Sequence, residues 1–205
     1  STSLIDLRTL RTLWKLDRVE VVFSLLVTLG VVAVGAINAI LFAVSLAVLR
    51  FVRFVSRPAV EVLGRVPGQP GFHSVERHPE AATLPGLLLF RFNGPVVFFN
   101  APHFKRELLA AVEAQAPGLR RVVLDMVPIP LVDATGLYVL REVVDKLGER
   151  GVLLSSAGRM AEWRDRAKRW GYDLATWGVL AYPTLESAVA GAVASAEGAE
   201  VALEG

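Results

Sequence analysis

The sequence predicts a membrane helical hairpin followed by an α/β domain in which helices cover a mixed β-sheet. Three observations lead to this fold class. Residues 21–49 contain no charged side chain, and this run is longer than the roughly 18 apolar residues that indicate a membrane segment. From residue 86 onward, short apolar runs alternate with stretches in which apolar residues recur every three or four positions, which is typical of strands alternating with helices. A helix start with the sequence Asp133-Ala-Thr-Gly136 lies between two of these stretches.

Composition and charge exclude several kinds of site and of binding partner. The 205 residues are 53% hydrophobic and include no cysteine, which excludes disulfides, thiolate catalysis and cysteine-based zinc sites. Residues 1–57 carry a net charge of +4 and residues 58–205 a net charge of −2. Because the basic excess accompanies the apolar segment, we expect no nucleic-acid partner. The chain begins with Ser1, and we expect it to be a fragment or a processed product.

The N-terminal residues predict an amphipathic helix over residues 4–16. Leucines and Trp14 fall on one helical face, and Arg8, Arg11 and Lys15 lie elsewhere. This pattern favours a helix in the membrane interface, with Trp14 at the level of the lipid headgroups. The alternative is an ordinary amphipathic helix packed on a protein core.

The apolar run at residues 21–49 is too long for one perpendicular crossing. As a single helix it would extend about 43 Å against a hydrocarbon core of about 30 Å. Basic side chains flank both of its ends, so the positive-inside rule places both ends in the cytoplasm. We therefore expect a hairpin with its turn near Gly30, Gly35 and Asn38. Each arm would reach only about 21 Å, so the hairpin requires a larger membrane domain to cover its turn.

Proline, glycine and asparagine mark the elements that follow. In order, these are the end of the apolar segment at Pro58, a short strand at Val60–Gly64 and a connector at residues 65–85. Residues 86–92 and 95–99 are predicted to pair as a β-hairpin, because Asn93-Gly94 suits a tight turn with positive φ.

The remaining elements alternate between helix and strand. Asn100 or a neighbouring residue is expected to cap a helix that runs to about residue 115. The later elements are a strand at Arg121–Asp125, a helix at 134–150, a strand at 151–155, and helices at 160–170 and 184–196.

The start of the helix at residue 134 is the candidate site. Asp133 is placed to act as the N-cap and to accept hydrogen bonds from the first turn. Thr135 and Gly136 then lie in that turn, where unpaired N–H groups and the helix dipole favour an anion. A hydroxyl at this point is suited to carrying a phosphate. The alternative is a well-capped helix start with no further role.

Other groups of reactive side chains do not form a site. The three histidines have no metal-ligand spacing: His73, His78 and His103. Asp125 and Asp133 lack the nucleophile and base that catalysis requires. Trp163 and Trp170 are seven residues apart, and we expect both to pack in the core beneath a solvated basic face. We therefore expect no catalytic residue, no metal site and no cofactor, and we do not expect an enzyme.

Six segments occur in an order that resembles one known family. They are LIDLRTLRTLWKLDR, SRPAVEVLGRVPG, VERHPEA, LLLFRFNGPVVFFNAPHFKREL, VDATGL and YPTLESAV. Together they resemble the C-terminal part of a SulP-family anion permease, comprising its last membrane helices and its STAS domain (sulphate transporter and anti-sigma-factor antagonist). The resemblance covers nearly the whole chain apart from its last residues.

The resemblance implies four regions and a function. The regions are an interfacial helix and terminal transmembrane hairpin at 1–57, a linker and first strand at 58–85, the STAS domain at 86–197 and a frayed tail at 198–205. The implied function is that of the C-terminal portion of a secondary-active inorganic anion transporter of the sulfate or bicarbonate type. Its STAS domain would regulate transport or support folding and dimerisation. The alternative is a membrane-tethered STAS phospho-switch that binds a protein partner without transport.

The resemblance also implies a location and partners. The protein would be a multi-pass protein of the cell membrane, with the STAS domain and both ends of the hairpin in the cytoplasm. Its partners would be membrane lipid, the rest of the membrane domain, a second copy in a homodimer and a cytoplasmic protein. The substrate site is expected upstream of this chain, between facing half-helices near mid-membrane. Sulfate, bicarbonate and dicarboxylate all stay open as substrates.

A regulatory role for the candidate site also comes from the resemblance. In soluble relatives of the STAS domain, a serine or threonine at the start of the second helix is phosphorylated and controls partner binding. Thr135 matches that position, and Asp133 and Gly136 match the flanking motif. A phosphate on Thr135 would add about −1.5 to −2 charges beside Asp133. The resulting repulsion is expected to expel a partner.

Overall fold

The computed structural model describes residue 22 and residues 35–201 of the chain. The chain divides into two units, Ser1–Phe54 and Val55–Gly205. The predicted interfacial helix at residues 4–16 and the first arm of the predicted hairpin lie outside the described residues.

Helix α3 (Ala36–Ser56) holds the second half of the apolar run. It begins directly after Gly35, whose φ of 83° lies in the left-handed region that glycine adopts without strain. Asn38 lies inside this helix, so its predicted place in a turn was wrong. Pro58 follows the last helical residue by two positions and limits the helix as expected. No helix in the described part of the chain is both long and apolar enough to cross a membrane.

The second unit is built on a six-stranded sheet with the strand order β2-β1-β3-β4-β5-β6. The strands are β1 (Val60–Gly64), β2 (His73–Ser74), β3 (Leu87–Phe92), β4 (Arg121–Asp125), β5 (Leu153–Ala157) and β6 (Leu180–Tyr182). β1 pairs antiparallel with β2 and β3, whereas β3, β4, β5 and β6 run parallel to one another. This is the mixed sheet that the sequence predicts.

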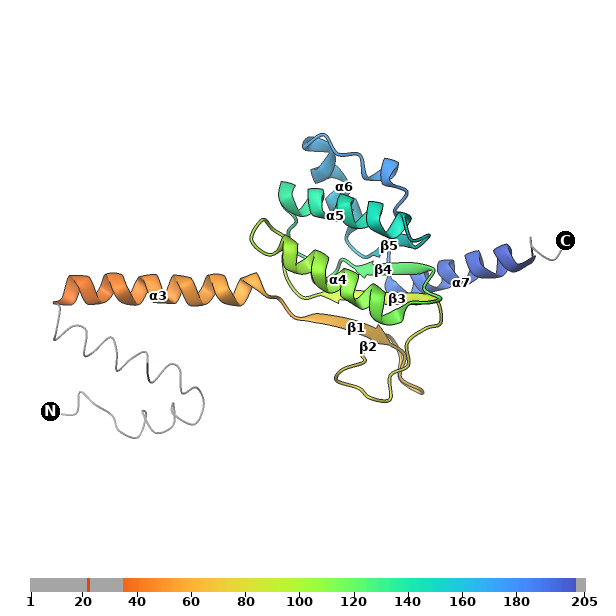
Figure 1. The fold of residues 1–205 in the computed structure, drawn as a ribbon, viewed down its shortest axis with the longest axis horizontal. Coiled ribbons are helices and arrows are strands. Elements are labelled where there is room, and N and C mark those ends of the chain that lie inside the picture. Colours follow the sequence, from red (N-terminus) through yellow and green to blue (C-terminus); the bar gives the residue numbers. More distant parts are fainter. Residues whose placement is uncertain (1–21, 23–34, 202–205) are drawn as a thin grey trace. The chain divides into compact units, whose positions relative to one another are not determined.

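Helices cover both faces of the sheet. They are α4 (Ala101–Gln115), α5 (Ala134–Gly148), α6 (Met160–Arg169), the 3-10 helix η1 (Leu174–Trp177) and α7 (Leu185–Val201). Figure 1 shows α4 and α5 side by side on one side of the strands, where they bury Phe90 and Leu124 in the larger core. α7 packs on the opposite face over Leu89 and Val123. Because β3 and β4 are covered on both faces, residues 87–90 and 122–124 are continuous apolar runs.

The predicted β-hairpin across residues 86–99 was wrong. β3 forms as expected, but its antiparallel neighbour is β1, and residues 95–99 form no strand. Neither Asn93 nor Gly94 adopts the positive φ that a tight hairpin turn requires. Pro95 also has no N–H to donate to a neighbouring strand.

Short elements and one helix end also differ from the prediction. β2 and β6 have two and three residues, which is too short for a periodic pattern to indicate. Trp163 is buried, as expected, but Trp170 is 44% exposed. Because α6 ends at Arg169, the seven-residue spacing does not place Trp170 on the packed face of the helix.

The larger core predicts a loss of stability when Leu108 of α4 is shortened. This side chain is fully buried against the sheet. Leu108→Ala is expected to lower the free energy of unfolding by about 2–5 kcal/mol, because it removes buried apolar atoms and leaves a cavity. Urea denaturation measures this change. Leu153→Ala is the matched control, because Leu153 is 54% exposed and its loss should change the free energy by less than about 0.5 kcal/mol. Equal losses in the two variants would contradict the assigned core.

Candidate functional site

Three connections meet at one edge of the sheet. β3 and β4 are parallel, so the loops that follow them, 93–100 and 126–133, leave from the same edge. β1 begins at this edge too, because Val60 pairs with Phe92 at the end of β3. The predicted site at the start of α5 directly follows the second of these loops.

Asp133 caps α5 and also fastens the neighbouring loop. Its Oδ1 accepts a hydrogen bond from the Gly136 N–H at 2.7 Å, which confirms Asp133 as the N-cap. Its Oδ2 accepts one from the Phe98 N–H at 2.8 Å. Backbone N–H groups therefore bind both carboxylate oxygens, and the side chain links loop 93–100 to α5.

Gly136 is buried where the two loops touch. The Val96 N–H donates to the Leu131 carbonyl at 2.8 Å, and the Asp133 N–H donates to the Val96 carbonyl at 3.2 Å. A Cβ on Gly136 would lie 2.3 Å from the Val96 carbonyl oxygen. This close approach requires glycine at position 136.

Thr135 is exposed between these two residues. The structure thus brings Asp133, Thr135 and Gly136 together in the first turn of α5. The N–H groups of the first turn favour a negative charge beside the exposed Thr135 side chain. Because two N–H groups already bind Asp133, this carboxylate is not poised to activate the hydroxyl as a nucleophile.

A row of charged side chains crosses three neighbouring strands. The sequence did not predict this row. The strand register aligns Glu61, Arg91 and Asp125 on β1, β3 and β4. Arg91 donates to Asp125 at 2.7 Å and lies 3.8 Å from Glu61, which also pairs with Arg77. Asp125 is 1% exposed and accepts a further hydrogen bond from the Val127 N–H. Each of these buried carboxylates thus has a cationic partner, and neither is a free acid for catalysis.

Asn100 ties the start of α4 to the chain before β1. It stands at the N-cap position, as predicted, but its side chain does not cap the helix. Its amide group donates to the carbonyls of Val55 (3.1 Å) and Pro95 (2.8 Å), and its oxygen accepts from the Val97 N–H (2.8 Å). The residue is completely buried, and these bonds satisfy its polar atoms. They also hold the turn that stands where a second hairpin strand was predicted.

The three histidines bond to backbone carbonyls or to a nearby carboxylate. His73 and His103 bond to backbone carbonyls, and His78 bonds to Glu80. No group of three metal-ligating side chains occurs in the part of the chain that the structure describes. The Glu80 backbone N–H, and after it the His78 ring, lower the pKa of the Glu80 carboxyl by hydrogen bonding.

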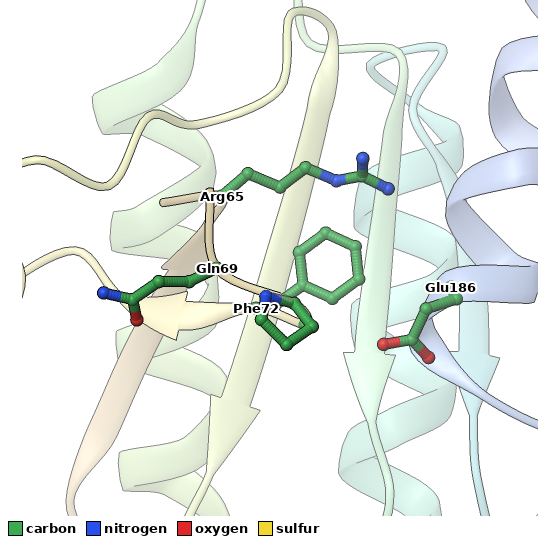
Figure 2. A pocket seen from close by; sticks show the side chains of 6 residues that line it. Arg65, Gln69, Phe72 and Glu186 are labelled. Carbon is green, nitrogen blue, oxygen red and sulfur yellow. The ribbon is translucent and has the colours of Figure 1, made fainter. Parts of the chain in front are cut away.

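A shallow hollow of about 130 Å³ lies between the chain after β1 and the start of α7 (Figure 2). Its lining residues are Arg65, Gln69, Pro70, Gly71, Phe72 and Glu186. The Arg65 guanidinium lies 5.3 Å from the centre of the Phe72 ring, a cation–π contact. Arg65 and Glu186 are both exposed, so the charges in this hollow are hydrated, and we assign it no ligand.

The close approach at Gly136 predicts opposite effects of one substitution at two glycines of α5. Gly136→Ala is expected to lower the free energy of unfolding by about 1–3 kcal/mol, because its methyl group overlaps the Val96 carbonyl. Gly148→Ala is the matched control, since a Cβ there meets open space. Alanine at that position is expected to raise the free energy of unfolding by about 0.4–1 kcal/mol through lower chain entropy in the unfolded state. Urea denaturation measures both, and equal effects would show that the loops do not meet at Gly136.

Known proteins resemble this chain over most of its length. Residues 78–188 match the STAS domain family. A Mycobacterium tuberculosis protein named a probable sulfate transporter is 34% identical over 154 residues, which are 75% of this chain and 28% of that protein. High affinity sulfate transporter 1 of Stylosanthes hamata is 26% identical over 160 residues, which are 74% of this chain and 24% of that protein. The chain thus spans about a quarter of the length of these relatives.

A solved structure has the same fold. The murine Solute Carrier 26 family member A9 anion transporter, in its inward-facing state, matches with a TM-score of 0.78 at 16% identity, over 90% of this chain and 30% of that one. At this identity the likeness shows the fold alone, whereas the family match covers more than half of the chain. The chain therefore belongs to the STAS domain family and is related to the sulfate transporters, as its resemblance to the SulP-family permeases predicted.

Proposed function

We propose that this chain is the C-terminal portion of a secondary-active inorganic anion transporter of the sulfate or bicarbonate type. Its STAS domain regulates transport or supports folding and dimerisation. One observation carries the proposal: the first strand of the STAS sheet follows, after only three residues, a helix whose apolar side chains are exposed. Relatedness to sulfate transporters supports the same function.

Helix α3 carries exposed apolar side chains along its length. They are Ile37, Ile40, Leu41, Phe42, Val44, Val48, Leu49, Phe51 and Val52. At 100° per residue, three consecutive positions such as 40, 41 and 42 do not share one face, so the helix is apolar on several sides. Such a helix is stable in a membrane or inside a larger protein. This supports membrane lipid and the rest of a transporter membrane domain as its partners.

Basic side chains support a cytoplasmic position for the STAS domain. Arg50, Arg53 and Arg57 are exposed towards the end of α3, and the positive-inside rule places such residues in the cytoplasm. The basic residues before residue 21 place the other end of the apolar run on the same side. The proposed protein is therefore a multi-pass protein of the cell membrane, and its substrate-binding residues belong to the preceding membrane domain.

Thr135 is the residue through which we propose regulation, with Asp133 and Gly136 shaping the turn around it. A phosphate on the exposed hydroxyl would place about −1.5 to −2 charges beside the Asp133 carboxylate. The added charge would weaken the binding of a cytoplasmic protein or a second copy of the chain at the first turn of α5. The site thus modulates an interaction and does not itself carry the anion.

Transport is testable with the complete product of the gene in cells that lack their own sulfate uptake. These cells are expected to accumulate radiolabelled sulfate or bicarbonate, and removing residues 58–205 is expected to abolish most of this uptake. An immunoblot of the membrane fraction controls for the amount of protein. If the complete product moves neither anion but still binds a cytoplasmic protein, the membrane-tethered phospho-switch replaces the transporter.

Charge at the start of α5 is testable at a single position. Thr135→Glu is expected to lower anion uptake or partner binding about fivefold, because a like charge brought to about 4 Å from the new carboxylate is repelled by about 1 kcal/mol even in water. Thr135→Gln is the matched control, because glutamine has nearly the same shape as glutamate but no charge. This variant is expected to behave like the unchanged protein. Equal uptake and partner binding in all three proteins would contradict a charge-driven switch at Thr135.

A further inference from the structure

Four exposed apolar side chains gather at the edge of the sheet where β3 and β4 end. We call them the apolar rim: Phe98 is 67% exposed, Phe99 37%, Val127 61% and Leu131 42%. The two phenylalanine rings contact each other with their centres 5.1 Å apart. The loops that carry the rim lie side by side, because the Val96 N–H donates to the Leu131 carbonyl. The Phe98–Phe99 pair places two exposed aromatic side chains together, and contiguous exposed apolar surface indicates an interaction site.

The backbone of the rim is held in place although its side chains face outward. The Phe98 N–H donates to Asp133, and the turn before it is held by the buried side chain of Asn100. The exposed rings are therefore held on an ordered backbone. They can be removed from water only if an apolar partner covers them.

The same edge of the sheet receives the chain from α3. The Asn93 N–H donates to the Ala59 carbonyl at 2.9 Å, and the Asn100 amide donates to the Val55 carbonyl at 3.1 Å. The loop that carries Phe98 and Phe99 is thus bound at both of its ends to residues 55–59. These residues directly follow the apolar part of α3.

We propose that the apolar rim docks on the anionic lipid surface of the membrane that α3 leaves. Phe98 and Phe99 would insert at the boundary between headgroups and acyl chains, where aromatic and apolar side chains are favoured. The inference rests on the proposed function, because the rim meets a bilayer only if α3 is anchored in one.

Charge favours a lipid surface as the occupant. Arg57 is exposed next to the rim loop, and Arg50 and Arg53 precede it on α3. No acidic residue occurs from residue 21 to residue 60. Clusters of arginine beside a membrane segment attract anionic headgroups, while the uncharged rim enters the apolar layer beneath them.

Single-cysteine labelling tests the proposal in the full chain. The chain has no cysteine, so Phe98→Cys provides one site for an environment-sensitive fluorophore. Val44→Cys reports whether α3 is anchored. Leu153→Cys is the matched control, because Leu153 is 54% exposed but pairs with Arg121 at the opposite edge of the sheet. Each labelled chain is reconstituted in vesicles of phosphatidylglycerol and phosphatidylcholine that contain spin-labelled lipid as a quencher.

Lipid docking predicts quenching at positions 44 and 98 and none at position 153. Quenching at position 44 alone would overturn rim docking and leave the proposed membrane attachment intact. Absence of quenching at position 44 would overturn both. A label at position 98 that is blue-shifted but not quenched would show that protein covers the rim, and this would also overturn lipid docking.

The charge dependence provides a second measurement on the Phe98→Cys chain. Adding Arg57→Gln is expected to lower the ratio of docked to free rim about fivefold, since one arginine near an anionic surface contributes about that factor. Arg120→Gln is the matched control, because Arg120 is exposed at the opposite edge of the sheet and should leave the ratio unchanged. Vesicles of phosphatidylcholine alone are expected to weaken the quenching at position 98. Equal quenching in neutral and anionic vesicles would overturn the requirement for anionic lipid.

Discussion

The carboxylate of Asp133 accepts hydrogen bonds from two backbone N–H groups, one of Gly136 in its own helix start and one of Phe98, which lies 35 residues before Asp133 in the chain. One oxygen caps α5 and the other holds Phe98, so the loop after β3 is drawn against the first turn of α5. That contact leaves no room for a side chain at Gly136 and leaves Thr135 facing outward. The Asp133 side chain therefore joins the candidate regulatory turn to the loop that carries Phe98 and Phe99.

Helices and strands that a local sequence pattern indicates could be predicted from the sequence. β1 and β4 have the predicted bounds, because a short run rich in valine and leucine marks each of them. Asp133 was predictable as the cap of α5 because its bond to Gly136 spans only three residues. The hairpin prediction failed for the converse reason: Asn93-Gly94 is a local signal, and it was overridden when β1 paired with β3 across the connector.

Side-chain contacts between distant segments had no local sign in the sequence. Arg91 and Asp125 are 34 residues apart, and Asn100 and Val55 are 45 apart. Each pair depends on how distant segments pack together, and no local pattern of residues indicates that packing. The same holds for the candidate site: its three motif residues were predictable from helix geometry, whereas its bond to the Phe98 N–H depended on where the loop after β3 would turn.

Loop 93–100 has no regular secondary structure beyond an isolated bridge at Val96, and side chains on either side of the sheet edge determine its shape. Asn100 holds it from within, and Asp133 holds it from the next loop. If the loop alone were transferred to another protein, Phe98 and Phe99 would no longer be held in the positions that they have here. Asn100 and Asp133 therefore determine the shape of this loop together, and a change of either side chain would remove hydrogen bonds that hold it.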